Sequence, residues 1–234
     1  MALPTLIPSR IVGAVAARCE STRRQAAVLA GRRRSALRSP ARAARSLAIE
    51  RGVGRLAVRG PITAAIPSSL GAEIAWLSVA GARAIVIEID SQGGDVAAAL
   101  AAHDLIRVCD LPTVSFTPDA AHSAASLLVL GCDRSVVAPE ARILVHRSAG
   151  GEERSCAAAD ERILAVYRER SGMDLQAWFD GAAEVYLDSV AAVTHGFADE
   201  IGGEWRAFAM ARALAAGDDV WSPRQAALAA ARVA

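Results

Sequence analysis

Residues 85–107, IVIEIDSQGGDVAAALAAHDLIR, change from an apolar run to a glycine turn and then to an alanine-rich helical pattern. The aliphatic run predicts a buried strand over 84–89, and the pattern that follows the glycines predicts a helix over 95–107. Paired glycines at such a turn let backbone N–H groups approach a ligand and point at a developing oxyanion. The stretch therefore predicts a strand–turn–helix unit whose turn is suited to acyl-transfer chemistry.

Strand and helix patterns continue to alternate on both sides of this unit. Further strands are predicted near residues 54–59, 112–117, 134–137 and 142–146. Further helices are predicted near residues 67–80, 123–130, 155–171 and 174–180. Because strands separated by helices favour a parallel sheet with right-handed crossovers, we expect an α/β fold.

A second stretch, SAASLLVLGCDRSVVAPEARILVH at 123–146, carries a serine at the start of a predicted helix and a histidine at the end of a predicted strand. A serine hydroxyl is a poor nucleophile at neutral pH. It needs a histidine to take its proton and a carboxylate to orient that histidine. The stretch therefore predicts Ser123 as a nucleophile and His146 as its general base.

Four segments in this order resemble the proteolytic subunit of Clp protease and its relatives in the Clp/crotonase superfamily. The resemblance covers roughly residues 52–203. It is carried by SQGG at 91–94, AAHSAAS at 120–126, PEARILVH at 139–146 and EVYLDSVAAVTHGFADEIGG at 184–203. It implies an α/β Clp/crotonase-like fold with a repeated β-β-α (spiral) core. The interval between His146 and Glu184 is about ten residues shorter than in ring-forming Clp peptidases, which implies a shortened helical handle.

The resemblance also implies a catalytic triad. Ser123 falls on the nucleophile position and His146 on the general base. Glu184 falls on the acid that holds the base, where these peptidases usually have Asp. Asp180 and Asp188 remain alternatives for the third member.

The resemblance further implies an oxyanion hole made by two backbone N–H groups. These belong to Gly94 and to Ala124, the residue that follows the nucleophile, while Gly93 supplies the turn.

The position of the nucleophile has alternatives. Counting back without gaps from Gly131 places it at His122, whereas alignment on Pro139 and His146 places it at Ser123. We prefer Ser123, because only a serine can perform the chemistry. Ser126, one helical turn further along, is the fallback.

These assignments predict a serine endopeptidase that acts on peptides or unfolded proteins and needs no cofactor or metal. The resemblance implies a homo-oligomer and an ATPase unfoldase as a partner. Two alternatives remain open: a catalytically inactive scaffold subunit of the same fold, and a crotonase-fold enzyme that acts on acyl-thioesters through the same oxyanion hole. The presence of both Ser123 and His146 counts against the thioester enzyme, which does not need them as partners.

Composition predicts one main domain with flanking segments. The 234 residues are 53% hydrophobic, which is enough for one domain with a proper core. We expect an Arg- and Ala-rich, disordered arm over 1–50, a peptidase domain over 51–203, and an Ala-rich helical tail over 204–234. Residues 1–48 hold ten arginines, yet the net charge of the chain is only +1, so nucleic acid is not an expected partner. The chain has no lysine, which excludes a Ser-Lys dyad.

The four cysteines, at positions 19, 109, 132 and 156, show no C-x-x-C spacing. Neither a metal site nor a disulfide is therefore expected. No apolar run approaches the roughly twenty residues of a membrane-spanning helix, and we expect a cytoplasmic protein.

Overall fold

The computed structural model describes residues 47–148, 153–171 and 184–218. The predicted helix over 174–180 lies outside the described residues. So do residues 1–46 of the expected arm and residues 219–234 of the expected tail.

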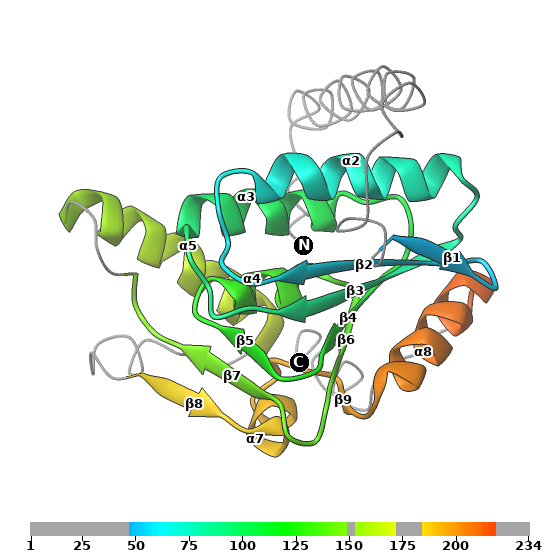
Figure 1. Ribbon diagram of the computed structural model, residues 1–234. Helices are drawn as coiled ribbons and strands as arrows, with labels where there is room; N and C mark the ends of the chain where they lie inside the picture. Colours follow the sequence, from blue (N-terminus) through cyan, green and yellow to red (C-terminus); the bar gives the residue numbers. More distant parts are fainter. Residues whose placement is uncertain (1–46, 149–152, 172–183, 219–234) are drawn as a thin grey trace, which may run out of the picture.

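A six-stranded sheet forms the centre of the fold (Figure 1). Its strand order is β1-β2-β3-β4-β6-β9, and every neighbouring pair is parallel except β1 and β2. The strands are β1 (Ala48–Glu50), β2 (Val53–Arg59), β3 (Ala84–Asp90), β4 (Thr113–Thr117), β6 (Arg134–Val137) and β9 (Glu200–Ile201). Parallel neighbours joined by helices confirm the expected α/β fold.

A smaller sheet has the order β5-β7-β8. Strand β7 (Arg142–Val145) is parallel to β5 (Ala120–His122) and antiparallel to β8 (Val185–Leu187). An isolated bridge between Ser91 and Ala121 links β5 to the end of the large sheet. The small sheet is therefore joined to the large one next to the glycine turn.

The two faces of the large sheet are covered by different helices (Figure 1). Alternate residues of β3, including Ile85 and Ile87, pack with α2 (Ile66–Val79), α3 (Val96–Arg107) and α4 (Ala125–Gly131). The residues between them, such as Val86, pack with Ala207 and neighbours of α8 (Glu204–Ala216). Each fully buried aliphatic side chain of β3 contributes about 1.5–3 kcal/mol. Two-sided burial thus explains why this strand is continuously apolar.

Two further helices complete the described chain. Helix α5 (Glu153–Ser171) packs beside α4, and the short α7 (Ser189–Thr194) follows β8. No helix among residues 47–148, 153–171 and 184–218 is both long and apolar enough to cross a membrane.

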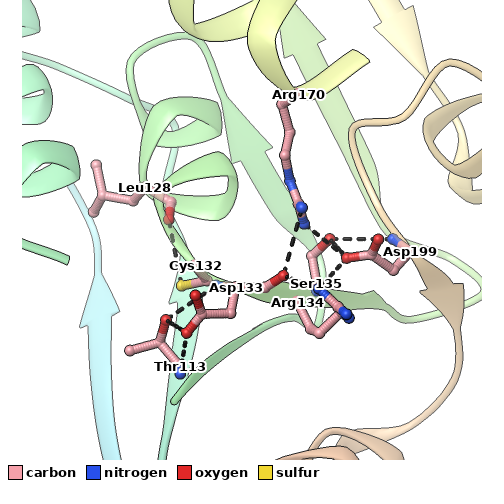
Figure 2. Close-up of polar contacts among 8 residues, drawn as sticks. All are labelled: Thr113, Leu128, Cys132, Asp133, Arg134, Ser135, Arg170 and Asp199. Atoms are coloured by element: carbon pink, nitrogen blue, oxygen red, sulfur yellow. Dashed lines mark hydrogen bonds and ion pairs between the residues drawn. The ribbon is translucent and has the colours of Figure 1, made fainter. Parts of the chain in front are cut away.

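A buried ion pair ties α5 to the large sheet (Figure 2). The Asp199 carboxylate accepts hydrogen bonds from the backbone N–H of Ser135 at 2.8 Å and from its hydroxyl at 3.1 Å. Arg170, near the end of α5, donates to the same carboxylate oxygen at 2.7 Å. Since the Asp199 side chain is only 1% exposed, the carboxylate depends on these donors to offset its lost hydration.

Candidate active site

Ser123 lies at a sharp bend between a strand and a helix. It follows the last residue of β5, two residues before the start of α4, and its φ is +54°. Its N–H donates to the carbonyl of Leu144 at 2.8 Å, which ties the bend to β7. A left-handed φ is uncommon for any residue other than glycine, and such strain persists only where the surroundings hold it.

The glycine turn packs directly against this bend. Gly93 has a φ of +94°, and a Cβ added to it would lie 2.7 Å from the His122 carbonyl oxygen and 2.8 Å from the Cβ of Ser123. Gly94 has a φ of +148°, and a Cβ there would lie 2.3 Å from the carbonyl oxygen of Ile62. Only glycine therefore fits at position 93 or 94. The packing requires the two glycines that the sequence analysis singled out for their turn chemistry.

Two backbone N–H groups beside the bend have no hydrogen-bond acceptor among the described residues. Among the residues that the structure describes, neither the N–H of Gly94 nor that of Ala124 donates to a protein acceptor. The Ala124 nitrogen lies 3.3 Å from the Cβ position built on Gly93, so the two parts of the expected oxyanion hole are neighbours. Unpaired donors of this kind can stabilise a negative charge.

His146 directly follows β7, and Glu184 directly precedes β8, the strand paired with β7. The register of β7 and β8 pairs Val145 with Val185, so the next residues outward, His146 and Glu184, face one another. Side chains at facing antiparallel positions lie about 5 Å apart at Cβ. The imidazole is half-buried, whereas Glu184 is exposed and accepts a hydrogen bond from the Tyr186 hydroxyl at 3.1 Å.

The three candidate triad residues thus meet at one end of the small sheet. Ser123 follows β5, His146 follows β7, and Glu184 precedes β8. Within the described residues, however, no hydrogen bond joins any two of them. The arrangement brings the three residues to one edge without completing a hydrogen-bonded triad.

The structure also reveals a contact that the sequence did not predict. His122 Nδ1 lies 2.7 Å from the amide oxygen of Gln92, and its ring meets Tyr186 edge-on at 5.9 Å between centroids. An amide oxygen only accepts, so Nδ1 is the donor and the neutral imidazole keeps a lone pair on Nε2. That Nε2 atom is buried and has no hydrogen-bond partner in the described part of the chain. The polar Gln92 side chain within the SQGG turn was the one available signal in the sequence.

Burial is the main cause of a lowered pKa for His122. The charge of Arg142 lowers the pKa further, while those of Asp119 and Glu184 oppose the shift. The imidazole is therefore held in its neutral form more firmly than an exposed histidine.

The alternative residues have other contacts. The Ser126 hydroxyl is fully buried and bonds both the Ser123 carbonyl and the Tyr167 hydroxyl, each at 2.7 Å. Asp188 accepts from the N–H of Ala191 at 2.8 Å and caps α7. Asp180 lies outside the described residues. Among the described residues, no three His, Cys, Asp or Glu side chains are grouped as metal ligands would be.

Comparison with known proteins identifies the family of the chain. A family model described as Clp protease matches residues 53–204, a segment that contains every candidate site residue. A point mutant of ClpP1 from Listeria monocytogenes has a similar structure, with a TM-score of 0.60 and 23% sequence identity. That match covers 64% of this chain and 92% of the other, and at this identity it shows the fold. Because the family match spans more than half of the sequence, the chain belongs to the Clp protease family.

Proposed function

We propose that the chain is a serine endopeptidase that hydrolyses peptide bonds with Ser123, His146 and Glu184 as its triad. The observation that carries the proposal is the left-handed bend at Ser123, packed against Gly93 beside two open N–H groups. A serine on a sharp strand-to-helix turn presents its hydroxyl while the following N–H points at the oxyanion, an arrangement that unrelated hydrolases also use.

In this mechanism an extended peptide lies along the glycine turn. The Ser123 oxygen attacks the carbonyl carbon, and its proton passes to Nε2 of His146. The N–H groups of Gly94 and Ala124 stabilise the oxyanion of the tetrahedral intermediate. His146 then protonates the leaving amine, and water hydrolyses the acyl-enzyme by the same proton route in reverse.

Glu184 holds the imidazole during these steps. Its carboxylate accepts the hydrogen bond from His146 Nδ1 and so stabilises the imidazolium that forms. Glu184 is exposed, and its one hydrogen bond among the described residues comes from the exposed Tyr186 hydroxyl, so the carboxylate can exchange that partner for the imidazole.

The resemblance to Clp peptidases supplies the rest of the proposal. The substrate is a peptide or an unfolded protein, several copies of the chain assemble, and an ATPase unfoldase delivers the substrate in the cytoplasm. No metal or nucleotide is required by the hydrolytic step itself.

A fluorophosphonate probe tests the nucleophile, because it reacts covalently with an activated serine. We expect labelling of the full chain that is lost in Ser123→Ala and kept in Ser68→Ala. Ser68 is the matched control, since its hydroxyl is exposed and bonds only the Ala65 carbonyl, on α2 away from the bend. Labelling that survives in Ser123→Ala and disappears in Ser126→Ala would show that Ser126, and not Ser123, is the nucleophile.

One observation favours a second candidate, a catalytically silent subunit. His122 stands where counting from Gly131 puts the nucleophile, and its contact with Gln92 holds an imidazole beside Ser123. A chain that is folded by circular dichroism and unlabelled by the probe would support this candidate and contradict the first.

A further inference from the structure

The carbonyl of Ser123 is held by a buried relay of two hydroxyls. It accepts from the backbone N–H of Ser126 at 3.0 Å and from the Ser126 hydroxyl at 2.7 Å. The Ser126 oxygen in turn lies 2.7 Å from the Tyr167 hydroxyl. Because Ser126 has one proton and the carbonyl can only accept, Tyr167 is the donor to Ser126.

The relay is closed to water and permanently protonated. Ser126 is 0% exposed and Tyr167 is 1% exposed. Burial raises the pKa of Tyr167 to about 12, so its hydroxyl keeps its proton at physiological pH. Hydrogen bonds in such surroundings hold their geometry well, since no water competes for the donors.

The relay acts on Ser123, whose backbone has a left-handed φ of +54°. Ser123 has its N–H fixed by Leu144 and its carbonyl fixed by Ser126, so both of its peptide planes are held. The plane that contains the Ser123 carbonyl also contains the Ala124 N–H. The direction of that N–H, one of the two proposed oxyanion donors, therefore depends on the bond to Ser126.

The far end of the relay, at Tyr167, is anchored as well. Tyr167 lies on α5 one turn before Arg170, which bonds the buried carboxylate of Asp199. The Tyr167 ring also meets Phe197 at 5.2 Å between centroids. Sliding α5 along α4 would therefore break the ion pair between Arg170 and Asp199, and the Asp199 side chain is only 1% exposed.

We propose that Ser126 and Tyr167 are positioning residues, which set the orientation of Ser123 and of the Ala124 N–H through the Ser123 carbonyl. The inference rests on the proposed function, because it assigns these two residues a role in the reactivity of Ser123. Neither hydroxyl is assigned a chemical step, since both are buried and engaged in hydrogen bonds.

The test compares probe-labelling rates of full-length variants. We expect Tyr167→Phe and Ser126→Ala to slow fluorophosphonate labelling of Ser123 by about tenfold, because small misplacements of reacting groups carry large penalties. The double variant is expected to be no slower than Ser126→Ala alone, since Tyr167 acts through Ser126. Tyr167→Phe keeps the ring and its packing, so it remains informative if Ser126→Ala unfolds.

Ser189→Ala is the matched control. Its hydroxyl is also buried and also donates to a backbone carbonyl, that of Pro139, at 2.8 Å. It is expected to lower the melting temperature as Ser126→Ala does and to leave the labelling rate unchanged. Equal slowing in Ser189→Ala, or wild-type labelling rates in both Tyr167→Phe and Ser126→Ala, would overturn this inference and leave the proposed function standing. Absence of labelling in the wild-type chain would instead overturn the proposed function and this inference with it.

Discussion

Replacing Gly93 with alanine tests how tightly the glycine turn is packed against Ser123. The natural control is Gly81→Ala, because the two glycines have nearly the same φ, +94° at Gly93 and +93° at Gly81. A Cβ on Gly81 has nothing within 4 Å, whereas one on Gly93 meets the His122 carbonyl at 2.7 Å and the Ser123 Cβ at 2.8 Å. The pair therefore separates steric contact from backbone strain.

The expected magnitudes follow from these contacts. Both variants carry the left-handed penalty of about 1–2 kcal/mol, partly offset by about 0.4–1 kcal/mol from a less flexible unfolded chain. Only Gly93→Ala adds overpacking, which costs about 1–3 kcal/mol, because its contacts are backbone and Cβ atoms that cannot rotate away. Gly93→Ala should thus have the lower free energy of unfolding by about 1–3 kcal/mol.

Urea unfolding gives the difference in stability, and fluorophosphonate labelling gives the effect on the site. Displacing Ser123 and Ala124 should slow labelling by about tenfold or more in Gly93→Ala, and Gly81→Ala should label like the wild type. Equal unfolding free energies for the two variants, with equal labelling rates, would refute the conclusion that Gly93 sets the position of the bend.

Three further predictions concern single charges. Glu184→Gln should reduce turnover of a peptide substrate by roughly 10²- to 10⁴-fold, whereas Asp188→Asn, which keeps a helix-capping oxygen, should leave turnover unchanged; steady-state kinetics compares them. Arg170→Met leaves the Asp199 carboxylate buried without its counter-charge, and urea unfolding should show a loss of about 3–5 kcal/mol. Burial alone would raise the pKa of Glu88, but hydrogen bonds from two arginines of β2 outweigh it and the pKa is lowered from 4.5. The contribution of Glu88 to the free energy of unfolding is therefore complete above pH 4.5 and is lost as the pH falls through the lower folded-state pKa. In Glu88→Gln, the free energy of unfolding measured in urea should fall less steeply as the pH is lowered.

Long periodic elements could be predicted closely from the sequence. The strand predicted over 84–89 is Ala84–Asp90, and the helix predicted over 95–107 is Val96–Arg107. Both have enough residues for their apolar pattern to reveal the period. Strands β5 and β8 were not predicted, because three residues do not establish an alternation and their pairing depends on distant partners.

The candidate site could be predicted only in part, again because some of its contacts join residues that are far apart in the sequence. Gly93 and Ser123 were identified from local motifs, and they do lie in contact. The bond between Ser126 and Tyr167 was not foreseen, because it joins residues 41 positions apart on two helices whose packing no local pattern describes. The facing of His146 and Glu184 likewise depends on a strand register that forms only in the folded chain.

The candidate site draws its parts from both sheets. Ser123, His146 and Glu184 all adjoin strands of the three-stranded sheet, while the Gly93–Gly94 turn continues from β3 of the six-stranded sheet. Two hydrogen bonds join the sheets beside this turn, from the Ser91 N–H to the Ala120 carbonyl at 2.8 Å and from the His122 N–H to the Ser91 carbonyl at 2.9 Å. The relative position of the Gly93–Gly94 turn and the three candidate side chains therefore depends on this seam, and a substitution that weakens it would disturb both parts of the site together.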